Sequence, residues 1–359
     1  MTNFTIEVTT TQACNFNCEY CFERDFEPAV TILDKNISLL TSQISSIFNS
    51  NWASKFDSFQ ITFWGGEPSL NMKMIDSIVE YFKDNEKVHY FIYTNGSNID
   101  ELIKVALKVK PRFRIQVSYD GQPLHDLRRK TKDGKETSVI VRESLKKLKQ
   151  NDIPYSIKST VTYKDFHYIP EVWNDFYELR KELGKDIRYG LTVDYHHIEF
   201  SKYKDIIEKT LIEIAKKEMR FYKEQGEFLT NIFSVNNKAI CSTGSSITVD
   251  TDGKVYLCHG CIYSEENKSL EISSIFNDTF LDDIHKNYLL FQDIKVPSEC
   301  DNCVALTCLK CSVKKYEHSS KSNLIERWTD YSVEKEICDY YKLSGRIGRA
   351  MLEILKEDC

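Results

Sequence analysis

The sequence lacks the features that would direct a protein into or through a membrane. No stretch of the 359-residue chain reaches the roughly 18 consecutive apolar residues needed to span a bilayer. The first residues, MTNFTIEVTTTQAC, contain neither the basic segment nor the apolar run of a secretory signal peptide. These absences lead us to expect a cytoplasmic protein with no membrane partner.

An excess of positive charge is also missing. The chain has 48 basic and 54 acidic residues, which gives a formal net charge of −6. Such a chain exerts no general attraction on nucleic acid or on an anionic membrane. The local cluster Arg128-Arg129-Lys130 is as consistent with a solvated turn as with a binding site. A nucleic-acid polymer is therefore a disfavoured partner.

Cysteine is absent from the long central part of the chain. Of the 12 cysteines, three lie between residues 14 and 21, nine lie between 241 and 359, and none lies between 22 and 240. In a reducing compartment, clustered cysteines bind metal or perform chemistry more often than they form disulfides. The uneven distribution predicts two separate sites, one toward each end of the chain.

Residues 4–200 alternate short apolar runs with longer amphipathic runs, a pattern typical of repeated strand–helix units. The predicted strands are 4–9, 59–64, 89–93, 113–118, 156–161 and 189–193. The predicted helices lie near 33–49, 72–84, 98–109, 138–150 and 171–183. Six such units suit a partial (β/α)6 barrel or a doubly wound parallel sheet, and periodicity alone does not separate the two.

The pattern changes after a long amphipathic helix predicted over 201–225. Thr251-Asp252-Gly253 predicts a hairpin turn between two short strands. Cysteine-rich loops and a closing helix near 333–356 follow. We therefore place a domain boundary near residue 230, which divides the chain into a larger domain, 1–230, and a smaller cysteine-rich one, 231–359.

The first cysteine group spaces Cys14, Cys18 and Cys21 as C-x3-C-x2-C. It directly follows the first predicted strand, which places it at the carboxyl edge of a parallel sheet, where active sites of such folds lie. Three thiolates on one loop can bind three irons of a [4Fe–4S] cluster and leave the fourth iron open to another ligand. A structural zinc site is the alternative, although no fourth Cys or His lies nearby in the sequence to complete it.

This triplet resembles the signature of the radical S-adenosylmethionine (SAM) superfamily, and other segments of residues 4–200 support the resemblance. Gly65-Gly66-Glu67-Pro68, at the end of the second predicted strand, is similar to that family's GGEP motif. The segments 93–96 and 118–121, which end the next two strands, look like its ribose- and carboxylate-contacting segments, together with Arg129. The resemblance implies a partial (β/α)6 barrel that holds a SAM-cleaving [4Fe–4S] cluster on the three cysteines.

The same resemblance implies which residues bind SAM. Glu67 would accept hydrogen bonds from the amino group, and the planar guanidinium of Arg129 would bind the carboxylate. The implied cofactor-binding residues are Tyr20, Gly65, Gly66, Glu67, Asn95, Ser118 and Arg129.

The second cysteine group contains the run C-x2-C-x4-C-x2-C, which by itself predicts a structural zinc ribbon. Together with Gly253-x4-Cys258 upstream and Cys338 downstream, the run resembles the SPASM extension of radical SAM enzymes that modify peptides and proteins. Both inner spacers are one residue shorter than in that pattern. The resemblance implies two auxiliary [4Fe–4S] clusters. Their ligands would be Cys241, Cys258 and Cys311, with Cys261 as an additional candidate, and Cys300, Cys303, Cys308 and Cys338.

By this resemblance the chain is a radical SAM enzyme, an oxidoreductase whose 5′-deoxyadenosyl radical takes a hydrogen atom from a peptide or protein substrate, as in peptide maturases. A flavodoxin or ferredoxin would donate the electron. The chain begins almost at the first strand, so we expect no N-terminal winged-helix recognition domain. The alternatives are a small-molecule or modified-nucleotide substrate, formylglycine formation in sulfatases, and a zinc- or cluster-binding regulator that is not an enzyme.

No catalytic base is assigned from the sequence. His259 directly follows Cys258, at a position where sulfatase maturases carry an acidic residue according to the family resemblance. An imidazole can also take a proton near neutral pH. His259 is thus a candidate ligand, a candidate proton-transfer group or a bystander.

Overall fold

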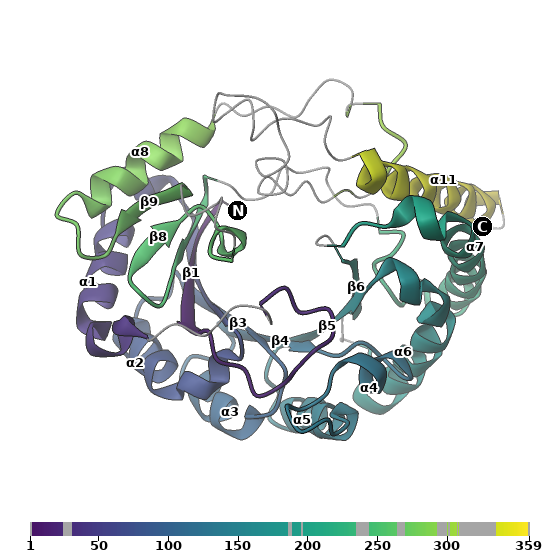
Figure 1. Cartoon of the computed structure of the whole chain (residues 1–359), viewed down its shortest axis with the longest axis horizontal. Helices are drawn as coiled ribbons and strands as arrows, with labels where there is room; N and C mark the ends of the chain where they lie inside the picture. The colour runs from purple at the N-terminus through teal and green to yellow at the C-terminus, as the bar shows by residue number, and fades with distance from the viewer. Residues whose placement is uncertain are drawn as a thin grey trace.

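The computed structural model describes most of the chain (Figure 1). The described residues are 2–23, 31–185, 189–194, 197–234, 244–263, 270–292, 300, 302–306, 308 and 335–357. Two of the predicted cluster ligands, Cys241 and Cys311, lie outside these residues, as does the terminal Cys359.

Six parallel strands form the main sheet in the order in which they occur along the chain. The predicted partial barrel is confirmed, because a doubly wound sheet would reverse its strand order part-way across. The strands curve around a common interior, and their helices form an outer layer (Figure 1). The strands are β1 (Asn3–Thr11), β2 (Ser58–Gly65), β3 (Val88–Thr94), β4 (Phe113–Ser118), β5 (Tyr155–Val161) and β6 (Tyr189–Val193).

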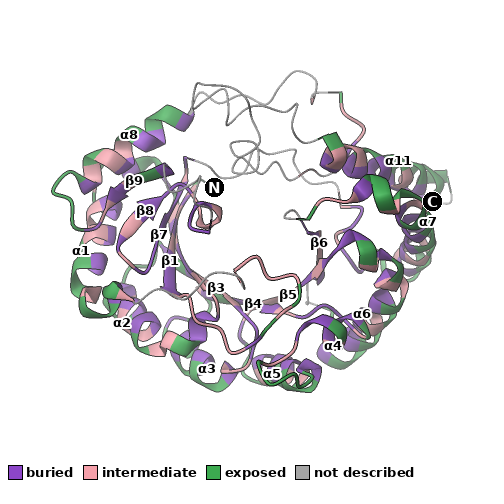
Figure 2. Cartoon of the chain, viewed as in Figure 1, coloured by how far each residue is buried: buried purple, intermediate pink, exposed green. Residues whose placement is uncertain are grey.

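Side-chain alternation along each strand separates the core from the barrel interior. On β1, Phe4, Ile6 and Val8 are fully buried against the helices, whereas Glu7 lies on the opposite face. The helices bury one face in the same core and expose the other (Figure 2). These helices are α1 (Ile37–Phe48), α2 (Met72–Phe82), α3 (Ile99–Leu107), α4 (Leu124–Arg128), α5 (Ser138–Gln150), α6 (Ile169–Leu183) and α7 (Phe200–Gln225).

Three further strands extend the barrel sheet beyond β1. They are β7 (Ser246–Val249), β8 (Lys254–Tyr256) and β9 (Glu271–Ser274). The predicted hairpin turn joins β7 to β8, and β7 pairs in parallel with β1. The sequence did not predict this second pairing, because β7 and β1 are separated by more than 230 residues of chain. The sheet is therefore continuous across the boundary proposed near residue 230, which stays a prediction.

The last two described helices cover the two ends of this open sheet. α8 (Phe280–Gln292) packs beside α1 and β9, and α11 (Lys335–Glu357) packs along α7. Two glycines of α11 allow close packing, because a Cβ on Gly345 would lie 2.7 Å from Ala305 Cα and one on Gly348 would lie 2.6 Å from Leu306 Cδ1. Among the described helices, none is both long and apolar enough to cross a bilayer.

Candidate active site at the cysteine loop

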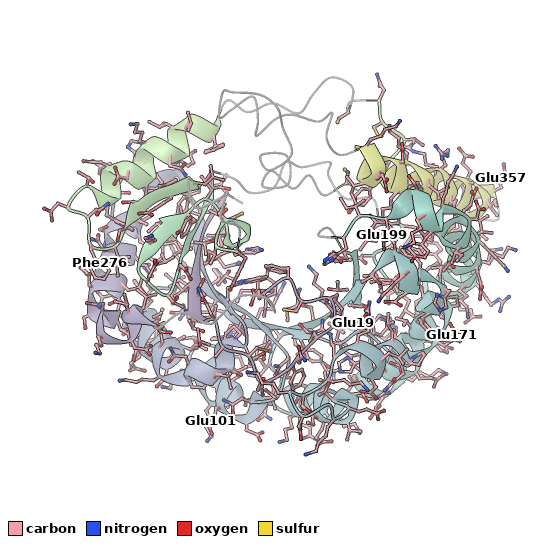
Figure 3. The ribbon with its side chains drawn as sticks, viewed as in Figure 1. Glu19, Glu101, Glu171, Glu199, Phe276 and Glu357 are labelled. Atoms are coloured by element: carbon pink, nitrogen blue, oxygen red, sulfur yellow. The ribbon has the colours of Figure 1, made fainter. Side chains whose placement is uncertain are left out.

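The loop that carries the first cysteine group lies at the carboxyl edge of the sheet, as the sequence predicts. It leaves β1 after Thr11 and is held by main-chain hydrogen bonds to the last residue of α4 and to the segment that follows this helix. Asn17 N donates to Lys130 O at 2.7 Å, and Glu19 N donates to Arg128 O at 3.0 Å. Figure 3 places Glu19 on the inner side of the barrel, whereas Glu101 and Glu171 lie on the outer helices. The loop is thus fixed over the barrel interior.

The three thiols of this loop suit an iron–sulfur cluster in chemistry and position. Cys14, Cys18 and Cys21 are partly exposed. Burial raises the pKa of Cys14 to about 12 and that of Cys21 to about 11, so these side chains are thiols until a metal binds and stabilises the thiolates. Within the described ranges no three metal-binding side chains already stand at coordination distance. The assignment of a cluster to these three cysteines stays a prediction.

The two glycines of the GGEP segment are needed because the end of β2 packs directly on the start of the cysteine loop. Gly65 has φ +140°, and a Cβ there would overlap the Thr11 carbonyl oxygen. A Cβ on Gly66 would lie 2.6 Å from Ala13 O. The two glycines therefore allow the end of β2 to pack directly on the backbone of residues 11–13. This contact holds the GGEP segment beside the cysteine loop.

Glu67 is buried and joins the ends of β2 and β3. Its Oε1 accepts hydrogen bonds from Ser69 N (3.1 Å), Ser69 Oγ (2.5 Å) and Thr94 Oγ1 (2.7 Å), and its Oε2 accepts one from Asn95 N at 2.7 Å. Burial raises the pKa of Glu67, although these donors oppose the rise. Because Oε2 accepts only one of these hydrogen bonds, it retains a lone pair for another N–H donor. The assignment of the SAM amino group to Glu67 stays a prediction.

Asn95 connects the third strand to the cysteine loop. Its Nδ2 donates to Asn15 Oδ1 at 2.8 Å, and Asn15 Nδ2 donates to Ser97 Oγ at 2.9 Å. Ser118, the last residue of β4, lies on the interior face of the sheet. The structure thus brings the predicted SAM-contacting positions of β2, β3 and β4 to one edge.

Sequence reasoning missed Asp120, on which the contacts beneath the cysteine loop converge. Its Oδ2 accepts hydrogen bonds from Arg129 Nε (2.8 Å), Tyr20 OH (2.9 Å) and Arg128 Nη2 (3.3 Å). Burial alone would raise the pKa of Asp120, but the two guanidinium groups hold it at about 2. The only signal in the sequence was its place in the segment that ends the fourth strand.

Arg129 is oriented by this carboxylate. With its Nε bound to Asp120, its Nη1 lies 3.8 Å from Cys18 Sγ, and its guanidinium lies 5.2 Å from the centre of the Tyr20 ring. Nη1 is thus directed toward the cysteine loop, and the predicted contact with a SAM carboxylate would use N–H groups that are not bound to Asp120. That contact stays a prediction.

His259 lies inside the barrel, in contact with two strands. Its Nδ1 is 2.9 Å from Glu7 Oε2, and its ring stacks on Trp64 with centroids 3.9 Å apart. Glu7 also accepts a hydrogen bond from Thr248 Oγ1 at 2.7 Å. Burial would lower the pKa of His259, but the neighbouring Glu7 carboxylate raises it to about 9. The structure therefore gives His259 defined partners on β1 and β2.

The second cysteine group is described only in part. Cys258 and Cys261 lie in one turn with their Sγ atoms 3.9 Å apart. This turn packs near the first cysteine loop, because the Phe22 ring contacts the Tyr263 ring at 5.4 Å. The other described members are Cys300, Cys303, Cys308 and Cys338. The two cysteine groups, far apart in sequence, thus approach each other at the turn that contains Cys258.

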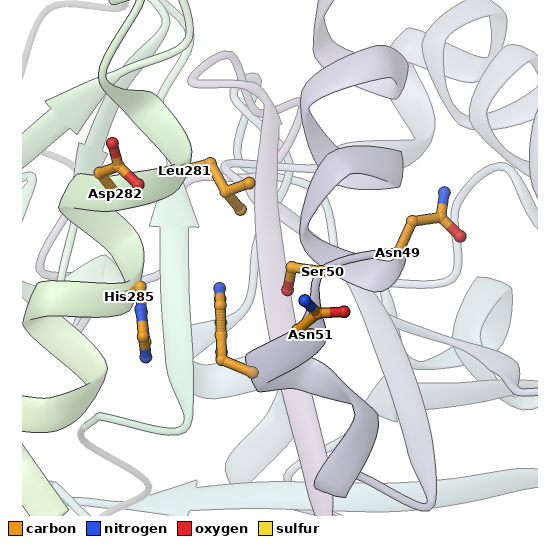
Figure 4. Close-up of a pocket in the computed structure, with 7 residues that line it drawn as sticks. Asn49, Ser50, Asn51, Leu281, Asp282 and His285 are labelled. Atoms are coloured by element: carbon orange, nitrogen blue, oxygen red, sulfur yellow. The ribbon is translucent and has the colours of Figure 1, made fainter.

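A separate hollow of about 620 Å³ lies on the outer surface between the segment after α1 and helix α8 (Figure 4). Trp52 and His285 are among the residues that line it. The two rings stack at 5.2 Å. Trp52 also contacts Phe4 at the beginning of β1, which is the end opposite the cysteine loop. We therefore do not assign this hollow to the chemistry of the site.

Residues 8–183 match the family described as the radical SAM superfamily. The chain carries a radical SAM domain. It is accordingly an enzyme of that superfamily, whose members use a [4Fe–4S] cluster and SAM. The cysteine loop and the GGEP segment both fall within the matched residues.

The curated relatives of this radical SAM enzyme carry names that describe different activities. An uncharacterized protein, MJ0907, of Methanocaldococcus jannaschii is 33% identical over 45% of this chain and 54% of its own length. The chain thus spans about half of that relative. The radical SAM cyclopropyl synthase TigE of Paramaledivibacter caminithermalis is 24% identical over 94% of this chain and 72% of its own length. A probable GTP 3′,8-cyclase of Saccharolobus islandicus is 26% identical over 79% of this chain and 90% of its own length.

Solved structures share the fold over nearly the whole chain. Native anSMEcpe with bound AdoMet (SAM) aligns with a TM-score of 0.69 at 19% identity, and the alignment covers 98% of this chain and 99% of that one. SuiB of Streptococcus suis, bound to its precursor peptide SuiA, aligns with a TM-score of 0.53 at 14% identity. This alignment covers 83% of this chain and 69% of SuiB. At these identities the likeness establishes the fold.

Proposed function

We propose that this enzyme modifies a peptide or protein substrate by radical SAM chemistry. The observation that carries the proposal is the likeness to anSMEcpe, which extends over the barrel, β7–β9 and the closing helix and covers 98% of the chain. That protein has been solved with AdoMet and the Cp18Cys peptide, and SuiB with a precursor peptide. Both neighbours thus bind a peptide on a fold of this kind.

The cofactors would be held by the residues at the sheet edge. We assign the SAM-cleaving cluster to Cys14, Cys18 and Cys21, and SAM to the edge formed by Gly65, Gly66, Glu67, Asn95, Ser118, Arg129 and Tyr20. When bound, this pair of cofactors supplies a 5′-deoxyadenosyl radical. The protein's part is to orient and shield it. Asp120 fixes the Arg129 guanidinium, and Glu67 fixes the ends of β2 and β3.

The C-terminal cysteines support a proposal of two auxiliary [4Fe–4S] clusters. Cys258 and Cys261 already lie 3.9 Å apart, which favours Cys261 as a ligand beside Cys258. The remaining assigned ligands are Cys241, Cys311, Cys300, Cys303, Cys308 and Cys338. We propose a flavodoxin or ferredoxin as the electron donor, because each turnover needs one low-potential electron.

A nucleotide or other small-molecule substrate is the second candidate. It is favoured by the similarity to a probable GTP 3′,8-cyclase over 79% of this chain. The likeness to anSMEcpe with its bound peptide covers 99% of this chain, and the formal net charge of −6 offers no general attraction for polyphosphates.

Deuterium transfer separates the two candidates without knowledge of the natural substrate. The reconstituted enzyme, SAM and a reductant are incubated anaerobically with a digest of perdeuterated bacterial protein, or with perdeuterated nucleoside triphosphates. A peptide substrate transfers deuterium to 5′-deoxyadenosine, which gains one mass unit by mass spectrometry. Transfer from the nucleotides and none from the peptides would replace the proposal with the second candidate.

A further inference from the structure

Lys158 lies on the interior face of the barrel in the middle of β5. Its chain neighbours Ile157 and Ser159 are 1% and 0% exposed on the helix side, so the alternation of the strand turns Lys158 inward. Among the described residues, no hydrogen-bond or ion-pair partner contacts its ammonium group. Burial lowers the pKa of Lys158 because nothing compensates its charge.

The positions beside Lys158 leave space in front of it. It pairs with Ser118 of β4 on one side and with Gly190 of β6 on the other. Among the described residues, a Cβ built on Gly190 would meet only Ile157 O within 4 Å, at 3.5 Å, so no described side chain lies directly on this glycine. Neighbouring strands are about 4.8 Å apart, which brings a molecule in this space within reach of all three positions.

A second polar atom with no partner lies on the neighbouring strand. Gln116 lies on the interior face of β4, one inward position before Ser118, and its Oε1 is buried without a hydrogen-bond partner among the described residues. Its Nε2 contacts Ser156 Oγ at 3.4 Å. The ammonium of Lys158, half-buried and without a partner among the described residues, favours an anionic ligand, because a charge removed from water is costly unless it is paired.

We propose that Lys158 binds a carboxylate of the substrate. The proposal rests on the proposed peptide substrate and specifies it further: the enzyme acts on a residue close to an acidic side chain or a C-terminal carboxylate. Lys158 is level with Ser118, which we assign to the SAM site, so the carboxylate lies near the carbon that reacts.

The charge around Lys158 suits one carboxylate better than a polyphosphate. The described inward positions next to it on the three strands are Gln116, Ser118, Ser156, Thr160, Gly190 and Thr192, and none of these is a cation. A single ammonium can balance a single negative charge, whereas a triphosphate requires several cations.

The test measures deuterium transfer from the perdeuterated protein digest in two forms, with free carboxyl groups and after methyl esterification of all carboxyl groups. Lys158→Met should lower transfer from the free-carboxyl digest about ten- to a hundredfold, the range for loss of one charged hydrogen bond. Esterification should lower deuterium transfer by the wild-type enzyme to a similar level, and it should leave deuterium transfer by Lys158→Met unchanged.

Two further variants separate this role from loss of folding. Gly190→Val fills the space without removing the charge and should also reduce transfer. Lys146→Met removes a lysine that is 42% exposed on α5 and should behave as wild type. Wild-type transfer by Lys158→Met, or equal effects of esterification on both proteins, would overturn the Lys158 assignment and leave the peptide proposal standing. Transfer from nucleotides alone would overturn both.

Discussion

At the scale of the residue, Asp120 and His125 organise the support beneath the cysteine loop. The buried Asp120 carboxylate receives hydrogen bonds from α4, from the residue after it and from the cysteine loop. His125 supports the Asp120 backbone, because its Nδ1 accepts a hydrogen bond from Asp120 N at 3.2 Å. Its Nε2 lies 3.0 Å from Thr137 Oγ1, whose hydroxyl donates to Arg129 O. His125 is therefore neutral in the fold, with its proton on Nε2.

This arrangement predicts a loss of stability in mild acid. Burial lowers the pKa of His125 from 6.5 to about 4, so the folded protein binds this proton less readily than the unfolded chain. The stabilisation is complete above about pH 6.5 and declines as the pH falls toward 4. Between pH 7 and 4.5, wild type should lose about 2–3 kcal/mol of unfolding free energy that His125→Gln does not lose.

Urea unfolding of the metal-free protein at the two pH values measures this difference. His167, which is exposed, provides the control, because His167→Gln should follow wild type at both pH values. An identical pH dependence for wild type and His125→Gln would show that His125 is not the group responsible.

At the scale of the element, helix α11 is positioned by close contacts rather than by its own sequence pattern. Its residue Gly345 lies against the backbone of Val304 and Ala305, in the segment that joins two of the proposed cluster ligands. Through this contact the closing helix supports the cysteine-rich segment and α7 together.

We predict that Gly345→Ala destabilises the protein, although alanine favours a helix over glycine by about 1 kcal/mol. The added Cβ would lie 2.7 Å from Ala305 Cα, so backbone must move, at a cost of about 1–3 kcal/mol. Gly190→Ala is the matched control, because its nearest contact would be an ordinary 3.5 Å. Denaturant midpoints compare the variants, and a midpoint for Gly345→Ala above that of wild type would contradict the packing argument.

At the scale of the whole molecule, the two cysteine groups share one end of the barrel. The turn of Cys258 and Cys261 packs near Phe22, which follows the first cysteine loop directly. β7 and β8 bring this turn there, because β7 pairs with β1 and so adds the C-terminal region to the barrel sheet.

The two groups should nevertheless bind metal independently. Changing Cys14, Cys18 and Cys21 to Ala should remove about four irons per chain and abolish 5′-deoxyadenosine formation, because one four-iron cluster loses all its thiolates. About eight irons should remain on the proposed auxiliary clusters. Cys359→Ala serves as the control and should keep the full iron content.

Iron and zinc analysis after anaerobic reconstitution measures both outcomes. Continued SAM cleavage by the triple variant would refute the assignment of the first cluster. One tightly bound zinc with no residual iron would refute the two auxiliary clusters, and four residual irons would leave only one of them.

The repeated strand–helix pattern and the place of the first cysteine loop were predictable from the amino-acid sequence, because both depend on local periodicity and on short-range spacing. All six barrel strands were predicted within a few residues from alternating apolar runs. Strand order, by contrast, was decided only by tertiary structure, since a period of two does not say which strands pair.

The same limit explains what was missed at the site. Asp120, Lys158 and the contact of His259 with Glu7 acquire their roles from residues 5 to 252 positions away in the chain. The amino-acid sequence does not show which side chains will surround a carboxylate or a lysine, because those neighbours are set only when the strands pair. Charge, burial and pairing at these residues are properties of the assembled barrel, and they were therefore available only from the tertiary structure.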